Sequence, residues 1–350
     1  MQGLMQDWPL TVDRVIDHAA RVHGTREVVT RRTDGTIART DYTTIHARAR
    51  QVSSALHELG IGLGDRVATL AWNSERHMEC WYGAMGIGAV LHTLNPRLHS
   101  DQLAWIANDA QGKVLILDTS FVPLIEPLRA RLPYQHYIII TDAANMPETS
   151  LPALAYEDWI AGASGAPQWG GFDENTACGL CYTSGTTGKP KGVLYSHRSN
   201  VLISLLTLGK GAFGIAPDDV VMPVVPMFHA NAWGLAFAAP MAGAKLVMPG
   251  GQLDGASVFE LLDRERVTFA AAVPTVWMLL LQHLRAHGPA LPWLKRVVIG
   301  GTALPEAILR TFEDDYGVEV VHAWGMTETS PTGTVGSIPA ALAEADRPTR

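Results

Sequence analysis

The chain has 350 residues, of which 47% are hydrophobic and 17% charged, and its formal net charge is −7. This is the composition of a globular protein, and the length predicts two or more subdomains around a substantial core. An acidic chain lacks a broad basic face for a phosphate backbone, so the charge argues against nucleic acid as the main partner, and anionic substrates must be met by local groups.

No secretion signal or membrane span is predicted. The N-terminal sequence, MQGLMQD, has no basic stretch followed by an apolar run. The longest apolar segments, 232–244 and 269–281, are shorter than the roughly 18 to 20 residues that cross a bilayer. We therefore expect a cytoplasmic protein.

The first third of the chain predicts helices around one strand. The first helix presents an apolar face at helical spacing, formed by Val12, Val15, Ile16 and Ala19. A second apolar helix pattern, 45–59, stops at Gly60, a suitable C-terminal cap. Residues 65–72 predict a strand and 75–89 a helix. The glycines at 83–88 lie inside that helix pattern, which favours close packing over a dinucleotide-binding fingerprint.

From about residue 113 strands and helices alternate. The predicted strands are continuous apolar runs, at 114–117, 137–141, 177–183, 220–225, 245–248, 267–273, 296–300 and 318–322. Such runs, separated by helix-length segments, are typical of strands buried on both faces, in a parallel sheet covered by helices. The predicted fold class is α/β. Small residues and prolines at 161–171 predict a join between a first subdomain, 1–165, and a second, 166–350.

Two residue pairs have the spacing of metal ligands, but the sequence around each pair does not fit a metal site. Cys178 and Cys181 lie in a predicted strand, where residues three apart point to opposite faces, so we interpret them as core thiols. His283 and His287 have helical i, i+4 spacing, but Leu284 stands where a zinc hydrolase needs glutamate. We interpret this histidine pair as part of a solvated helix face.

Residues 183–192, TSGTTGKPKG, follow a predicted strand and form the most informative motif. Its glycines let backbone N–H groups converge on one anion, its hydroxyls add donors, and its two lysines add positive charge. The motif therefore predicts a triphosphate cradle, with a flexible surface loop as the alternative. Gly185 and Gly188 are too close for a Walker A loop, and no Ser or Thr follows Lys189, which disfavours a P-loop NTPase.

Three further motifs follow in order: PMFHANAWG at 226–234, GGT at 300–302 and WGMTET at 324–329. With these four motifs the chain resembles the AMP-forming acyl-CoA synthetase, luciferase and peptide-synthetase adenylation superfamily, over nearly its whole length. It looks closest to bacterial ligases for fatty acids and for 3-methylthiopropionate. The resemblance implies stacked, mostly parallel sheets flanked by helices, as in the N-terminal domain of the adenylate-forming fold, with the β-barrel subdomain incomplete.

The reaction implied by the resemblance has two steps. A carboxylate attacks the α-phosphorus of ATP to give an acyl-adenylate and pyrophosphate, and coenzyme A thiol then displaces AMP. Mg²⁺ is the implied cofactor, and a carboxylic acid, ATP and coenzyme A are the implied partners, with a homodimer as a further expectation. We expect a medium- or long-chain fatty acid. The alternatives are 3-methylthiopropionate, an aryl acid, or a catalytically silent nucleotide-binding module.

The same resemblance assigns site residues. Catalytic roles fall to His229, Thr327 and Glu328, and Mg²⁺ ligation to Thr183 and Glu328. The acyl group is expected beside Asn231, Trp233, Thr275 and Gly300. The ATP and AMP contacts are expected from Thr183, Ser184, Gly185, Thr186, Thr187, Gly188, Lys191, Gly301, Thr302, Ala323, Trp324, Gly325, Met326 and Thr327. Without the resemblance, His229 and Trp233 would be interpreted as core residues and Glu328 as an exposed acid at a helix start.

The family continues beyond the position of Arg350, with an aspartate that holds the ribose, a hinge and a mobile C-terminal domain that carries a catalytic lysine. The C-terminal domain is therefore expected to be absent here. On that expectation, the 350 residues alone would bind ATP weakly and form little acyl-CoA.

Overall fold

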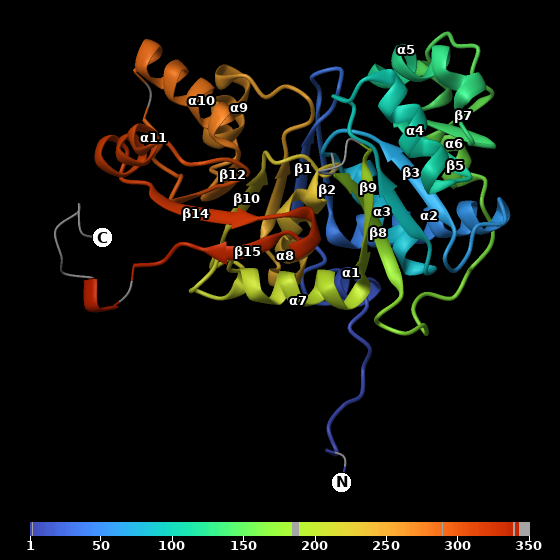
Figure 1. Cartoon of the computed structure of the whole chain (residues 1–350), viewed down its shortest axis with the longest axis horizontal. Helices are drawn as coiled ribbons and strands as arrows, with labels where there is room; N and C mark the ends of the chain where they lie inside the picture. The colour runs from blue at the N-terminus through green and yellow to red at the C-terminus, as the bar shows by residue number, and fades with distance from the viewer. Residues whose placement is uncertain (2, 184–188, 289, 339, 343–350) are drawn as a thin grey trace.

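Two open β-sheets form the frame of the molecule, and helices cover them (Figure 1). The structure is a computed structural model that describes residues 1, 3–183, 189–288, 290–338 and 340–342. The α/β class and the mostly parallel sheets predicted from the sequence are confirmed. Across the described residues, every helix is too short or too polar to cross a bilayer.

One sheet contains seven strands within the described residues. Its order is β7 (Ala153–Ala155), β6 (His136–Ile140), β5 (Val114–Asp118), β3 (Arg66–Leu70), β4 (Val90–Thr93), β8 (Ala177–Thr183) and β9 (Lys191–Ser196). Neighbours from β7 to β8 run parallel, and β9 returns antiparallel along β8. The predicted triphosphate motif therefore connects the two strands of an edge hairpin.

The other sheet contains eight strands within the described residues. Its order is β15 (Thr332–Val335), β14 (Glu319–Gly325), β13 (Arg296–Ile299), β12 (Phe269–Ala272), β10 (Val220–Pro223), β11 (Lys245–Met248), β1 (Glu27–Arg31) and β2 (Ile37–Asp41). The inner pairs are parallel, whereas β2 and β15 run antiparallel at the two edges. Both sheets remain open in the described part of the chain.

The helices begin where the sequence supplies caps. Asp41, Ser74, Ser196 and Asp254 each accept a hydrogen bond from a backbone N–H of the first turn that follows. Gly60 has φ +74° just past the second helix, which confirms it as the cap. The bounds are α1 Asp13–Val22, α2 Tyr42–Glu58, α3 Glu75–Gly86, α4 Ser100–Ala110, α5 Val122–Ile125, α6 Tyr156–Ala161, α7 His197–Leu208, α8 Leu235–Ala242, α9 Gly255–Arg264, α10 Pro274–His287 and α11 Glu306–Arg310.

The largest core cluster joins α1, α2, α3 and α8 to strands of both sheets. Trp81 and Tyr82 of α3 pack on Phe237 of α8, with ring centroids 5.3 and 5.8 Å apart. The Tyr82 hydroxyl also donates to the Ala236 carbonyl at 2.9 Å. Burying side chains of this size contributes about 1.5 to 3 kcal/mol each. The two sheets are therefore held by one continuous core.

Several strands were missed by the sequence patterns. β2, β9 and β15 are edge strands with exposed or half-buried residues, so they lack continuous apolar runs. β1, β4 and β7 are short strands that were also missed. The helix expected over 75–89 ends at Gly86, because the chain turns at Gly88 with φ +76° and enters β4. Both sheets draw strands from each side of residue 165, so the division into 1–165 and 166–350 stays a proposal.

The three cysteines are buried free thiols, as expected of core residues.

Candidate functional site

A cavity of about 160 Å³ lies where β13, the segment after β10 and the β14–β15 hairpin meet. Three of the sequence motifs line it, although they are far apart along the chain. Its walls are formed by Phe213, His229, Ala230, Trp233, Gly300, Gly301, Ala323, Trp324, Gly325, Met326, Thr327, Pro331 and Thr332. The fold therefore brings nine of the residues expected from the resemblance to one place.

Trp324 forms an aromatic wall of this cavity. A Cβ atom added to Gly333 of β15 would lie 2.7 Å from its Cζ3 atom, so the indole ring rests on the glycine backbone. The side chain is nevertheless 55% exposed. A ring that is supported on one side and open on the other is suited to stacking a flat base.

Trp233 is delivered to the cavity by an unusual turn. Ala230, Asn231, Ala232 and Trp233 all have φ between 45 and 55°, and Gly234 follows at 79°. Left-handed backbone costs residues with a Cβ atom about 1–2 kcal/mol each. Such strain persists only where the surrounding structure holds it, and it concentrates at functional sites.

Gly300 and Gly301 make room for the Trp233 ring after β13. A Cβ atom on Gly300 would lie 2.7 Å from the Ala323 carbonyl oxygen and 3.2 Å from Cη2 of Trp233. Gly301 has φ +84°, and a Cβ atom there would meet Val273 at 3.1 Å. The close approach of the ring and the backbone therefore depends on glycine at position 300, and the turn depends on it at position 301.

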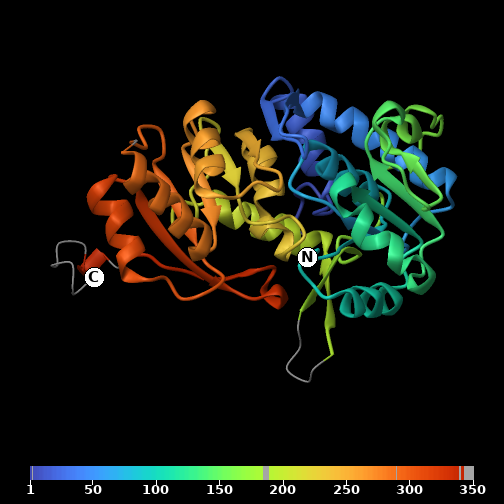
Figure 2. The same ribbon diagram turned by 90° about the horizontal axis from the view of Figure 1, so that it is seen from above.

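The strand that leads into the triphosphate motif lies beside the second motif. β8 contacts the turn Thr327–Thr329, and Figure 2 shows the β8–β9 hairpin next to the β14–β15 hairpin. Burial raises the pKa of Tyr195 on β9, and the nearby Cys181 and Glu328 groups raise that pKa further. Glu328 therefore lies near the hairpin that carries the motif, whose residues 184–188 lie outside the described part of the chain.

His229 stands exposed at the rim of the cavity. The surrounding protein disfavours the charged imidazolium and lowers the pKa of His229, and the positive charge of Arg97 lowers that pKa further. A neutral ring can donate or accept a hydrogen bond at the rim without adding charge.

The donor set beside β8 fits Mg²⁺. Thr183 ends β8 and is half-buried, and the exposed carboxylate of Glu328 lies in the turn that contacts this strand. Carboxylate and hydroxyl oxygens are ligands that Mg²⁺ accepts, usually together with water and phosphate oxygens. These two residues would hold the ion, which neutralises phosphate charge when bound.

Other expected site residues lie elsewhere. Asn231 is 4% exposed and does not line the cavity, because the left-handed turn directs its side chain toward α7. Thr275 lines a separate hollow between α10 and α11, because it sits on the first turn of α10. Thr302 and Lys191 are exposed and are not among the lining residues.

Four lining residues were missed from the sequence: Phe213, Ala230, Pro331 and Thr332. Pro331 and Thr332 follow the motif 324–329 with only Ser330 between them, so that motif could have been extended. Phe213 carries no local signal, because a lone aromatic residue in an apolar segment is usually core.

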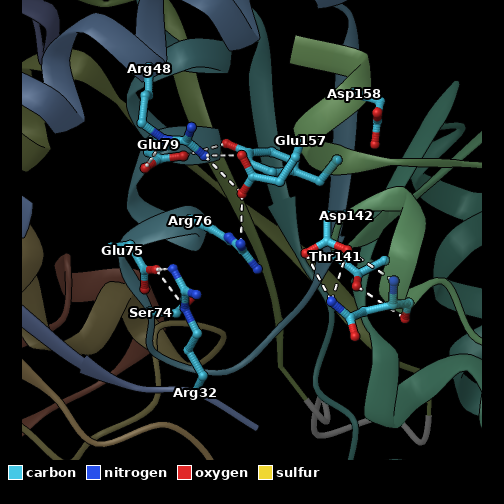
Figure 3. A network of polar contacts seen from close by, with 12 residues as sticks. Arg32, Arg48, Ser74, Glu75, Arg76, Glu79, Thr141, Asp142, Glu157 and Asp158 are labelled. Atoms are coloured by element: carbon cyan, nitrogen blue, oxygen red, sulfur yellow. Dashed lines mark hydrogen bonds and ion pairs between the residues drawn. The ribbon is translucent and has the colours of Figure 1, made fainter. Parts of the chain in front are cut away.

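A larger polar cavity, of about 310 Å³, lies at the seam between the sheets. Figure 3 shows ion pairs at this cavity and in the hollow beside it, which join α2, α3, α6 and the β1–β2 turn: Arg32 with Glu75 at 2.8 Å, Arg48 with Glu79 at 2.8 Å and Arg76 with Glu157 at 2.7 Å. Each of these guanidinium groups already has a carboxylate partner. The network therefore braces the seam.

The fold is that of the N-terminal domain of adenylate-forming enzymes. It matches the N-terminal domain of FACL13 from Mycobacterium tuberculosis with a TM-score of 0.79 and 26% identity, over 93% of this chain and 78% of that one. The family model of AMP-binding enzymes matches residues 16–349. The chain belongs to the AMP-binding enzyme family.

Two curated relatives are similar along most of the chain. A 3-methylmercaptopropionyl-CoA ligase of Ruegeria lacuscaerulensis is 48% identical over 336 residues, which are 95% of this chain and 62% of that protein. A medium-chain-fatty-acid–CoA ligase of Ectopseudomonas oleovorans is 46% identical over 339 residues, which are 96% of this chain and 62% of that protein. The chain thus spans about three fifths of the length of these relatives.

Proposed function

We propose that the protein is an AMP-forming acyl-CoA ligase that activates a medium- or long-chain fatty acid with ATP and Mg²⁺ and transfers it to coenzyme A. The observation that carries this proposal is the cavity in which Trp324, Thr327 and the glycines after β13 meet Trp233 and His229. The identity to ligases of this kind along the chain supports it. A cytoplasmic location belongs to the same proposal, and so does a homodimer, which rests on the resemblance alone.

In the proposed reaction the protein acts by positioning and by charge compensation. Trp324 stacks the adenine, Thr327 meets the α-phosphate, and the motif after β8 holds the outer phosphates. The acid carboxylate lies near His229, and its chain extends along Trp233 and Gly300. Holding the two reactants in line converts a bimolecular encounter into a step within one complex, and donors aimed at the phosphate stabilise the shifting charge.

A second candidate is a ligase for 3-methylthiopropionate. The chain is 48% identical to the Ruegeria lacuscaerulensis ligase and 46% identical to the medium-chain enzyme, so sequence identity supports this candidate as well as the first. The cavity volume of about 160 Å³ is also compatible with a short acid.

The deciding experiment is acid-dependent pyrophosphate release, followed by acyl-CoA formation, across short, medium, long and aryl acids. The proposal requires the highest kcat/KM for a medium or long aliphatic acid. A maximum at 3-methylthiopropionate selects the second candidate. The assay is made on the 350 residues alone and after extension with a relative's C-terminal portion. Absence of pyrophosphate release with every acid in both forms, in a protein that binds ATP, would leave a nucleotide-binding module.

Loss of single donors from the triphosphate motif should weaken ATP binding. Each charge-assisted hydrogen bond contributes about 1.5 to 3 kcal/mol, so Thr186→Ala, which removes a hydroxyl donor, should raise the Kd for MgATP by roughly tenfold or more. Gly188→Ala keeps its N–H but restricts the backbone conformations that can aim that group at a phosphate, so the Kd should rise there as well. Titration calorimetry measures this change. Gly62→Ala is the control, because an added Cβ there meets nothing within 4 Å. Wild-type affinity in both motif variants would exclude the motif from phosphate binding.

Removal of the Trp233 ring should change the order of preferred acids. Trp233→Ala opens space against Gly300 and Gly301, so kcat/KM should rise for bulkier acids relative to shorter ones. The cavity left behind should also cost stability, by about 3–5 kcal/mol. Trp293→Ala removes a 39% exposed tryptophan elsewhere and should leave the order of acids as it is. An unaltered order in Trp233→Ala would remove this residue from the acyl wall, whatever happens to stability.

A further inference from the structure

Asn231 sits in the middle of the left-handed turn, two residues before Trp233. Its φ and ψ are 54 and 41°, a conformation that asparagine tolerates better than most residues with a Cβ atom. Its side chain is buried, is bonded to Asn200 of α7 and is not among the residues that line the cavity. In this geometry Asn231 does not reach the cavity proposed for the acid.

The Asn231 amide is instead paired inside the protein. Its Nδ2 donates to Oδ1 of Asn200 on α7 at 3.2 Å, and its Oδ1 accepts from the Cys181 thiol at 3.7 Å. Asn200 in turn donates to the Ser196 carbonyl at 3.3 Å and lies 3.1 Å from the Cys178 sulfur. These groups are almost completely buried, Asn200 being 1% exposed.

Buried polar groups of this kind favour one arrangement of the chain. If the turn rotated, the Asn231 amide would lose both of its partners and Asn200 Oδ1 would lose its donor, all away from water, and an unpaired buried group costs more than the bond it made. The pair also links the turn to β8 and α7, which are packed elements, rather than to a loop. The hydrogen bonds of Asn231 to α7 and β8 thus hold the strained backbone, while Trp233 lines the cavity.

We propose that Asn231 is a positioning residue: its amide bond to Asn200 holds the left-handed turn and thereby sets where Trp233 stands against Gly300 and Gly301. In the acyl-CoA ligase proposed above, on which the selectivity part of this inference rests, Asn231 and Asn200 determine acid preference without touching the acid.

Three variants separate the amide pair from the backbone strain. Asn231→Gly accepts the left-handed conformation and removes both side-chain bonds. Asn200→Ala removes the hydrogen bond between Asn231 and Asn200 by changing α7, and leaves residue 231 unchanged. Ala232→Gly is the matched control, because Ala232 has φ 49° in the same turn and its side chain makes no hydrogen bond.

The first measurement is hydroxyl-radical footprinting with mass spectrometry, which needs no activity. Trp233 is 8% exposed in the wild type, whereas Trp324 is 55% exposed and serves as the internal reference. Oxidation of Trp233 relative to Trp324 should rise severalfold in both asparagine variants and remain at the wild-type level in Ala232→Gly.

The second measurement is the ratio of kcat/KM for a short and a long acid. Loss of the amide pair should shift this ratio about tenfold, which corresponds to about 1.4 kcal/mol, with the KM for ATP unchanged. In a Trp233→Ala background, Asn231→Gly should shift the ratio no further, because the residue it positions is gone. If Asn231 had only a structural role, its replacement would lower the melting temperature and leave the ratio of the two kcat/KM values unchanged.

The proposal would be overturned if Trp233 were oxidised to the wild-type extent in both asparagine variants. It would also be overturned if Trp233 were oxidised as strongly in Ala232→Gly as in the asparagine variants. If the wild-type protein released no pyrophosphate with any acid, even after extension with a relative's C-terminal portion, the proposed ligase function and the selectivity part would fail. Footprinting would still decide whether Asn231 positions Trp233.

Discussion

Gly325→Ala is expected to reduce acid-dependent pyrophosphate release by at least about 100-fold. A Cβ atom at this position would lie 1.8 Å from the Pro331 carbonyl oxygen and 2.8 Å from the Pro331 carbonyl carbon. Both obstacles are backbone atoms, so no side-chain rotation relieves the clash. Met326 N–H also donates to the Pro331 carbonyl at 3.0 Å, which ties the two segments together at this point.

The displaced backbone carries the candidate nucleotide wall. Trp324 lies one residue before Gly325 and Thr327 two residues after it, so separating β14 from residue 331 moves both side chains that would meet the adenine and the α-phosphate. Misplacement of reacting groups by about 1 Å can cost roughly 100-fold in rate.

The measurement for Gly325→Ala combines initial rates of pyrophosphate release with MgATP affinity, and a thermal melt shows whether the variant is folded. Gly211→Ala is the matched control, because Gly211 is exposed and an added Cβ meets nothing within 4 Å. A folded Gly325→Ala protein with wild-type turnover would contradict the placement of this segment at the active site.

His92→Leu is expected to stabilise the protein, and increasingly so as the pH falls. His92 lies on β4 with no exposed surface, its ring is 5.3 Å from that of Tyr182, and neither ring nitrogen has a hydrogen-bond partner among the described residues. Leucine fills a comparable volume and carries no polar atom. Removing an unpaired buried polar group should raise the free energy of unfolding by about 1–3 kcal/mol at pH 7.

The pH dependence follows from the lowered pKa of His92, which burial brings from 6.5 to about 3. Below pH 6.5 the unfolded chain binds a proton at this residue and the native state does not, so stability is lost as the pH falls. The loss is about 1.4 kcal/mol per pH unit, and it continues down to the native pKa. Above pH 6.5 the protonation contribution is absent in both states.

Denaturant unfolding at pH 7 and pH 5 tests this expectation. The stability gap between His92→Leu and the wild type should widen by about 2 kcal/mol over that interval. The control is His57→Leu, since His57 is exposed on α2. If the gap were the same at both pH values, His92 would not remain neutral in the folded protein.

The strand-forming and loop-forming segments could be largely predicted from local patterns. The run at 245–248 is β11 with the same bounds, and the helix pattern at 45–59 ends beside Gly60 as α2 does, because capping and side-chain period act over a few residues. The four motifs together indicated the family, since each places glycines, hydroxyls or aromatics at a definite spacing along the chain. For the same local reason, β2 and β9 escaped notice, because an edge strand needs no continuous apolar run.

The sequence by itself determined the α/β class, the AMP-binding motifs and most of the cavity wall. Tertiary structure alone decided that β1 pairs with β11, that Trp233 meets Gly300, and that Asn231 turns toward Asn200. These contacts join residues many positions apart. Local sequence patterns do not distinguish between the possible tertiary arrangements, and the burial of strands and paired amides in one core selects among them. Thr275 and Asn231 were expected beside the acid from the family resemblance alone, and the direction of each side chain was set instead by the helix or turn that carries it.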